Sequence, residues 1–193
     1  TLFLFPLSQI EFSQFENYKQ TTENLEERLL YGCYPEVTHY ESWKEKQEYL
    51  REIVNSYLLK DILIFDGIKN ADKIYDLLRL IAFQVGKEVS LQELGNQLNL
   101  SKNTVEKYLD LLSKVFVIFK IEGFSRNLRK EITKSSRWYF YDNGIRNAIL
   151  NNFNTLNNRT DIGDLWENYL ASERIKKQHY QKMVKQNYFW RTY

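Results

Sequence analysis

One stretch near the middle of the chain limits the possible folds more than any other, because it meets the demands of a helix-turn-helix position by position. Ser90 and Glu93 have the spacing of a capping box, in which the serine hydroxyl accepts an amide hydrogen bond and the glutamate reaches back to the cap amide. Asn99 stands where the chain must reverse, and asparagine tolerates the left-handed backbone that such a turn needs. Gly95 leaves room for two helices to approach closely, and Ser101 can cap the second of them. The pattern predicts two helices joined by a tight turn.

The neighbouring segments complete a winged helix. A helix capped by Asp72 is expected before the pair. The runs 116–121 and 137–141 are rich in β-branched and aromatic residues, and a basic turn at 125–136 separates them, so a hairpin with a long tip is expected. Three helices followed by a hairpin is the winged-helix order, which we assign to residues 71–150.

The remaining segments are expected to be mostly helical. Residues 42–65 show a long amphipathic pattern inside a helical region at 17–70, and residues 161–177 show a second one. Apolar or aromatic runs at 2–7 and 188–193 are strand candidates. Together these segments predict a mainly α protein with a small β component.

Composition excludes several kinds of site. Cys33 is the only cysteine among the 193 residues, so no disulfide and no cysteine-based metal site can form within the chain. We expect it to be a small buried apolar residue. His39 and His179 lie far apart without partner ligands, so no metal site is expected. The absence of an apolar run of about 20 residues predicts that no segment spans a membrane and that the protein is cytoplasmic.

The net charge of +2 conceals an uneven distribution. Residues 11–52 hold ten glutamates against five lysines and arginines, whereas residues 101–137 hold nine lysines and arginines against four acidic residues. A nucleic acid partner, DNA or RNA, would therefore meet the middle of the chain. A protein partner would find an acidic surface at residues 11–52.

The expected recognition helix and wing supply the candidate binding residues. The first turns of a recognition helix enter the major groove, where lysines contact phosphates and an asparagine can read an adenine edge. The candidate nucleic-acid-binding residues are Lys102, Asn103, Thr104, Lys107, Arg126, Arg129 and Lys130. Glu106 and Asp110 place negative charge on the same helix face, which opposes the approach of phosphate.

Four strings resemble a prokaryotic family of AAA-type P-loop ATPases that carries a conserved C-terminal domain of unknown function. They are Leu4 to Phe12, Leu30 to Glu36, Tyr57 to Asp61 and Ser136 to Gly144. Cys33 departs from the family pattern, because it replaces the usual second glycine of a Tyr-Gly-Gly turn. The resemblance implies an exit segment of the ATPase core at residues 1–16, a helical linker region at 17–70, the winged helix at 71–150 and an incomplete restriction-endonuclease-like tail at 151–193.

The same resemblance implies chemistry outside this chain. The ATP site would precede Thr1, so ATP and Mg²⁺ are expected in the full-length protein and no cofactor is expected in this chain. In the tail, Glu167 would be a nuclease-like carboxylate and residues 189–192 would begin the first core strand. Without a phosphate loop and with a single such carboxylate, the fragment is expected to catalyse no reaction.

Three functions follow from the sequence. The leading one is a nucleic-acid-binding winged-helix region that serves an ATPase domain. The alternatives are a protein-interaction or regulatory module of that ATPase, and a truncated or degenerate nuclease.

Overall fold

The computed structural model describes residues 4–58, 71–124, 136–183 and 185–190. The chain is mainly helical with one four-stranded sheet, which confirms the fold class predicted from the sequence. The first half holds α1 (Gln9–Phe12), α2 (Tyr18–Glu23), α3 (Leu25–Tyr31), the 3-10 helix η1 (Pro35–His39), α4 (Trp43–Glu52) and the π-helix η2 (Ile53–Leu58). The second half holds α6 (Ala71–Phe83), β1 (Glu88–Val89), α7 (Leu91–Leu98), α8 (Lys102–Lys114), β2 (Ile118–Gly123), β3 (Ser136–Phe140), α10 (Asn143–Leu150), the 3-10 helix η3 (Leu156–Asn158), α11 (Ile162–Tyr180) and β4 (Tyr188–Phe189).

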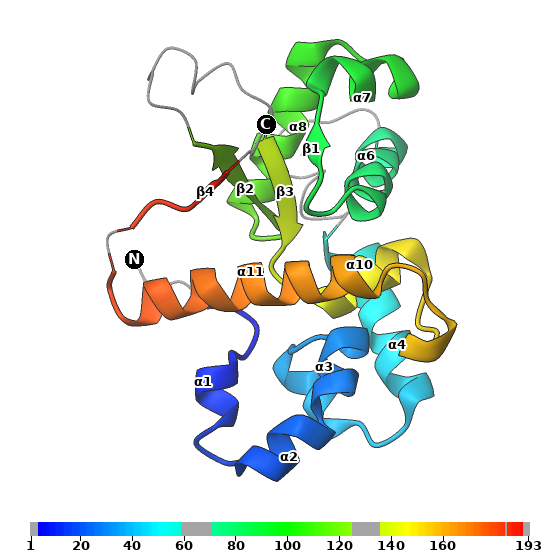
Figure 1. Cartoon of the computed structure of the whole chain (residues 1–193). Helices are drawn as coiled ribbons and strands as arrows, with labels where there is room; N and C mark the ends of the chain where they lie inside the picture. The colour runs from blue at the N-terminus through cyan, green and yellow to red at the C-terminus, as the bar shows by residue number, and fades with distance from the viewer. Residues whose placement is uncertain (1–3, 59–70, 125–135, 184, 191–193) are drawn as a thin grey trace.

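The long helix α11 divides the molecule into two layers (Figure 1). The sheet and α6 to α8 lie on one side of it, and α1 to α4 lie on the other. The main apolar core joins α4, α6, α7, α8, α10 and the inner face of the sheet. A second, smaller core of Leu29, Cys33, Leu165 and Tyr169 fills the space between α3 and α11. Cys33 is therefore buried, as the sequence analysis predicted.

The helix-turn-helix has the expected local geometry. The Ser90 hydroxyl accepts the Glu93 amide hydrogen at 3.3 Å, and Asn99 adopts the left-handed conformation with φ 54°. A Cβ on Gly95 would lie 2.6 Å from the Leu100 carbonyl oxygen in the turn and 3.6 Å from the amide nitrogen of Lys102, the first residue of α8. The Gly95 carbonyl in turn accepts the Leu100 amide at 2.8 Å. Gly95 therefore lets the turn fold back against α7 before Ser101 caps α8.

The sheet has the order β1-β3-β2-β4. Strands β2 and β3 pair antiparallel, with Lys120 opposite Trp138, and form the wing hairpin that the sequence predicted. The strand candidate at 188–193 gives β4, which pairs in parallel with the end of β2. The tail therefore extends the wing sheet here, whereas the resemblance implied that this strand begins a separate nuclease-like core.

Three N-terminal expectations differ from the structure. Residues 4–7 form no strand, and residues 1–3 lie outside the described ranges. Within the amphipathic pattern at 42–65, the α-helix ends at Glu52 and a π-helix follows as far as Leu58, while residues 59–65 lie outside the described ranges. The short helix α1 was not anticipated, and α2 lies inside the expected helical region at 17–70, although Ser8 and Asn17 begin the two helices with complete capping boxes. These helices are four and six residues long, too short to show an apolar repeat.

Helix α10 holds the two layers together through polar side chains. The last carbonyls of any helix lack partners within that helix. Asn147 donates to the carbonyl oxygens of Leu29 and Leu30, at the end of α3, at 3.2 and 2.7 Å. Arg146 donates from Nε to the Ala82 carbonyl, at the end of α6, at 3.0 Å. Helix α10 therefore supplies hydrogen-bond donors to carbonyl oxygens at the C-terminal end of one helix in each layer.

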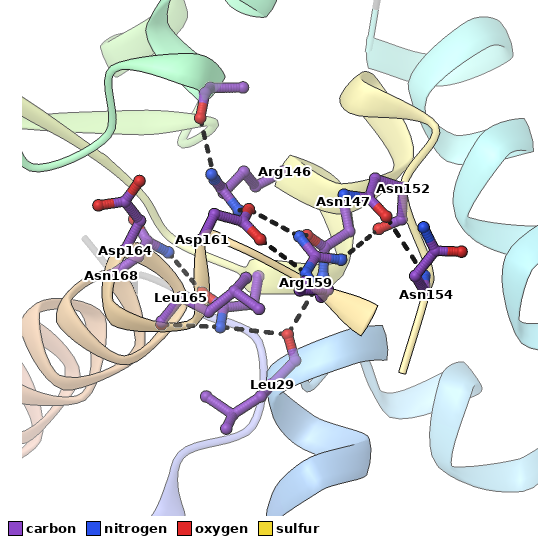
Figure 2. A network of polar contacts seen from close by, with 12 residues as sticks. Leu29, Arg146, Asn147, Asn152, Asn154, Arg159, Asp161, Asp164, Leu165 and Asn168 are labelled. Atoms are coloured by element: carbon purple, nitrogen blue, oxygen red, sulfur yellow. Dashed lines mark hydrogen bonds and ion pairs between the residues drawn. The ribbon is translucent and has the colours of Figure 1, made fainter. Parts of the chain in front are cut away.

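A buried ion cluster fixes α10 to the start of α11 (Figure 2). Arg146 and Arg159 both donate to the carboxylate of Asp161 at 2.8 Å. Both arginine side chains are almost fully buried, at 1% and 0% exposure. Burial disfavours the charged carboxylate, but hydrogen bonds from Arg159 and Arg146 prevail and lower the pKa of Asp161 to about 2. The ion cluster thus joins α10, which contacts both layers, to the start of α11.

Candidate functional site

A groove of about 1090 Å³ lies between α8 and the wing sheet. One wall is the exposed face of α8, the other is the face of β2 and β3 that carries Lys120 and Trp138, and the start of α7 closes one side. Its volume is slightly above the range for ligand clefts, about 300–1,000 Å³. The lining residues are Val89, Ser90, Leu91, Gln92, Lys102, Asn103, Glu106, Lys107, Leu109, Asp110, Ser113, Phe119, Lys120, Glu122, Ser136 and Trp138.

The recognition-helix residues expected from the sequence fall into two groups. Lys102, Asn103 and Lys107 are exposed and line the groove together. Thr104 is half-buried and does not line it, because its hydroxyl lies 2.8 Å from that of Ser101, the cap of α8. Thr104 therefore supports the helix start, and its expected contact with nucleic acid stays a prediction. The expected wing residues Arg126, Arg129 and Lys130 lie outside the described residues.

The charges that line the groove cancel. Its three lysines, Lys102, Lys107 and Lys120, are matched by three acidic residues, Glu106, Asp110 and Glu122. Both walls carry both signs, since Lys120 and Glu122 form an ion pair at 2.6 Å on β2. On α8, Asp110 pairs with Lys114 at 2.6 Å. The basic excess of the sequence between 101 and 137 is therefore not found among the described residues of this groove.

The groove also has an apolar part that the sequence did not reveal. Val89, Leu109 and Trp138 line it and are at most 7% exposed. In the sequence, Trp138 was recognised only as a residue of a strand. Which face of that strand it occupies becomes clear from the register, because Trp138 lies opposite the exposed residue Lys120. A groove with charged walls and an apolar floor can bind a ligand that is itself amphipathic.

Glu167, the possible nuclease-like carboxylate, lies away from the groove. It accepts a hydrogen bond from the Tyr139 hydroxyl at 2.7 Å and forms an ion pair with Arg137 at 3.5 Å. Partial burial, together with the adjacent Glu167 carboxylate, raises the pKa of Tyr139 to about 12. A side chain on Gly86 would also collide with this carboxylate, at 2.7 Å. Glu167 therefore links α11 to β3.

The remaining sequence expectations concern the Cys33 thiol, metal sites and membrane-spanning helices. Cys33 is fully buried, and burial raises the pKa of its thiol. Within the described ranges, no three histidine, cysteine or acidic side chains are grouped so that they could hold a metal ion. No helix in those ranges is long and apolar enough to cross a membrane.

Comparison with known proteins gives one family match and several distant relatives. Residues 22–156 match the family model described as a domain of unknown function, DUF8612. The chain is 26% identical over 152 residues to an "Uncharacterized protein" of Haemophilus influenzae, an alignment that covers 74% of this chain and 38% of the relative. It is 24% identical over 138 residues to "Uncharacterized protein MJ1544" of Methanocaldococcus jannaschii, covering 63% of this chain and 31% of the relative. The chain thus spans less than two fifths of the length of either relative. No solved structure matches it significantly.

Proposed function

Because the chain belongs to the DUF8612 family, a domain of unknown function, we propose its function from the geometry of the groove: it is a winged-helix docking module that binds a segment of a partner protein. The observation that carries this proposal is the balance of charge along the groove. Three lysines and three acidic side chains face the same space, above an apolar floor.

Charge balance distinguishes the two classes of macromolecule. A nucleic acid is recognised first through its phosphates, which require a net excess of lysine and arginine on the protein. A protein interface instead combines an apolar centre with a polar rim. In the groove, Val89, Leu109 and Trp138 form the apolar part, and charged side chains of both signs line the same space. This arrangement favours binding of a peptide segment that has little net charge.

The proposal extends to the longer proteins in which such a chain occurs. The relatives are more than twice as long as the matched region, and the four family-like strings resemble ATP-binding proteins. We therefore place the docking module in the C-terminal part of an ATPase, whose own domain would bind ATP and Mg²⁺. The buried joint at α10 supports this role, because a rigid module can transmit a change in the position of its base to the groove.

Nucleic-acid binding is the second candidate, and one observation favours it. Lys102, Asn103 and Lys107 are exposed on the first turns of α8, the positions that a recognition helix places in the major groove. The whole stretch 101–137 carries more basic than acidic residues. Binding of this kind would be steeply salt-dependent, with a loss of about 10³–10⁵-fold between about 50 and 200 mM salt for six to ten phosphate contacts.

Charge reversal in the groove separates these two candidates. The probes are an array of short synthetic peptides with zero net charge, each with one Lys, one Glu and a central Phe, and a short labelled DNA duplex. Glu106→Lys combined with Asp110→Lys makes the groove strongly basic, so we expect this variant to lose peptide binding and to gain DNA binding. Arg79→Glu is the matched control, because Arg79 is exposed on α6 and does not line the groove.

Binding by the wild-type protein distinguishes peptide docking from nucleic-acid binding. Retention of peptides by the wild type and the control, but not by the double variant, supports protein docking. If the array contains no binder, or if the wild type binds only the duplex with a steep salt dependence, the docking proposal is refuted.

A further inference from the structure

Three exposed aromatic side chains are grouped at the outer edge of the wing sheet. Strand β4 forms this edge of the described sheet and lies beside β2, on the side away from β3 (Figure 1). The rings of Phe124 and Trp190 are stacked with their centroids 5.0 Å apart, and Tyr188 meets the Phe124 ring edge-on at 6.0 Å. Trp190 is still 64% exposed in this stack. Grouped aromatic side chains on a surface are a feature of interaction sites.

The strand register shows that this aromatic patch continues the wall of the groove. Lys120 and Glu122 of β2 line the groove. Side chains alternate between the two faces of a strand, so Phe124 lies on the same face as these two residues. Tyr188 is aligned with Glu122 in the parallel pair, and Trp190 follows two residues later. The patch therefore extends the groove beyond Glu122.

The opposite face of the same strands shows which ligand chemistry such a patch accepts. Phe189, between Tyr188 and Trp190, points to that opposite face, where the Arg137 guanidinium lies 4.4 Å from its ring centroid. Arg137 also pairs with the Glu167 carboxylate at 3.5 Å. The face of an aromatic ring attracts a cation, and the carboxylate adds to this attraction. On the groove face, Trp190 and Glu122 offer the same two partners, a ring and a carboxylate.

We propose that an arginine side chain of the docked peptide stacks on the exposed ring of Trp190 and pairs with the Glu122 carboxylate. This proposal rests on the proposed docking function and specifies a side chain that the partner must carry. Positions two residues apart on one face of a strand are separated by about 7 Å, so one guanidinium can reach both groups. Lys120 lies 2.6 Å from Oε1 of Glu122, so the arginine is expected at Oε2. A planar guanidinium stacks on a ring and donates to a carboxylate at once, which an ammonium group does less well.

The charge at the patch distinguishes a peptide from a single-stranded nucleic acid. A nucleobase can also stack on an exposed tryptophan. Its strand would bring phosphates towards Glu122, whose side chain is 43% exposed and negatively charged. Charge complementarity therefore favours an arginine of a peptide.

Paired peptides test the proposal on the whole chain. The lysine of the tightest peptide from the array is replaced by arginine, and in further peptides the arginine is moved one position at a time. Each peptide has a twin with lysine at the same position, so the net charge stays zero. We expect the best arginine peptide to bind wild type about twofold to fivefold more tightly than its twin. The ring current of Trp190 should also move the δ-methylene protons of that arginine upfield in the bound peptide.

Variants of exposed residues identify the ring and the carboxylate. Trp190→Leu should abolish both the preference for arginine and the upfield shift, and Glu122→Gln should weaken the arginine peptide more than its twin. Trp43→Leu is the matched control, because Trp43 is 63% exposed at the start of α4 and does not line the groove. This control should keep the preference.

The outcomes separate this proposal from the docking function. If peptides bind but arginine and lysine twins bind equally, or if the preference survives in Trp190→Leu, the arginine site is refuted and docking stands. If no peptide binds wild type, docking fails and the arginine site with it. If a single-stranded DNA binds and Trp190→Leu weakens it, while no peptide shows the arginine preference, the patch binds bases and the proposal is wrong.

Discussion

Replacement of Asp161 by asparagine is expected to destabilise the folded protein, because it removes the anion of the buried ion cluster between α10 and the start of α11. The Asp161 carboxylate is shared by Arg146 and Arg159, each at 2.8 Å. After the substitution, two buried guanidinium groups keep only neutral acceptors, such as the Ala82 carbonyl oxygen for Arg146 and the Asn152 carbonyl oxygen for Arg159. A buried cation that loses its counter-charge destabilises the folded state strongly.

Two estimates bracket the size of the effect. The pKa of Asp161 falls from 3.8 to about 2, and one pKa unit corresponds to about 1.4 kcal/mol, so the ionised carboxylate is worth about 2 kcal/mol more than the neutral one. Removal of one partner from a buried ion pair costs about 3–5 kcal/mol. Because Asp161 is partly exposed, at 20%, we expect Asp161→Asn to lower the free energy of unfolding by about 2–4 kcal/mol.

Urea denaturation followed by circular dichroism measures this change. Asp164→Asn is the matched control on the same helix, because Asp164 forms an ion pair with Lys87 at 3.6 Å, that lysine side chain is 61% exposed, and Asp164 acts on Arg146 more weakly than Asp161 does. An exposed pair of this kind is worth about 0–1 kcal/mol. If Asp161→Asn costs no more than Asp164→Asn, the buried ion cluster does not hold the layers together and the reasoning fails.

Acid titration tests the same cluster without a mutation. A carboxyl group whose pKa is lowered in the folded state stabilises the protein above its unfolded pKa and loses that contribution as the pH falls. The contribution of Asp161 is therefore complete above 3.8 and disappears as the pH falls towards about 2. The free energy of unfolding, obtained from urea denaturation across this pH range, should fall by about 2 kcal/mol more in wild type than in Asp161→Asn. Parallel curves for the two proteins would contradict the assignment.

Three further changes test other parts of the fold. Gly95→Ala should destabilise the protein by about 1–3 kcal/mol, because the new Cβ meets the Leu100 carbonyl oxygen. Gly163→Ala is the control, because a Cβ there has open space, and it should be neutral or stabilising by up to about 1 kcal/mol. Thermal unfolding of both variants measures the difference. Asn147→Ala should cost about 1–3 kcal/mol by leaving buried carbonyl oxygens unpaired, and a urea midpoint like that of wild type would disprove this role. The Cys33 thiol should react with a disulfide reagent only as fast as the protein unfolds, because it is buried; rapid labelling of native protein would contradict its placement.

The parts of the fold that depend on local chemistry could be predicted from the sequence. Ser90, Asn99 and Ser101 act through backbone groups a few residues away, so their spacing alone indicates the caps and the turn. Asp142 is a similar case, since its carboxylate accepts the Ile145 amide hydrogen at 3.1 Å, as expected of a helix cap. The exposed positions of Lys102 and its neighbours on α8 also follow from the helical repeat.

The rest depends on residues that are far apart in the chain. The same Asp142 carboxylate also accepts the Cys33 amide hydrogen at 2.7 Å, across 109 positions of sequence, and no local pattern announces this contact. The joint at Arg146 and Asn147 links helix ends in the same way. The charge balance of the groove was missed because the count over 101–137 includes basic residues that do not line it, such as Lys114, which pairs with Asp110, and Arg137, which pairs with Glu167.

The central claim, that the groove between α8 and the wing docks a protein segment, is tested most directly by the salt dependence of binding to the wild-type chain. The same preparation would be titrated with the tightest zero-charge peptide and with the short DNA duplex, at about 50 and 200 mM salt. The account predicts peptide binding that changes little between the two salt concentrations, and weak or absent binding of the duplex. Duplex binding that is tight at low salt and collapses at high salt, with no peptide binding, would contradict it.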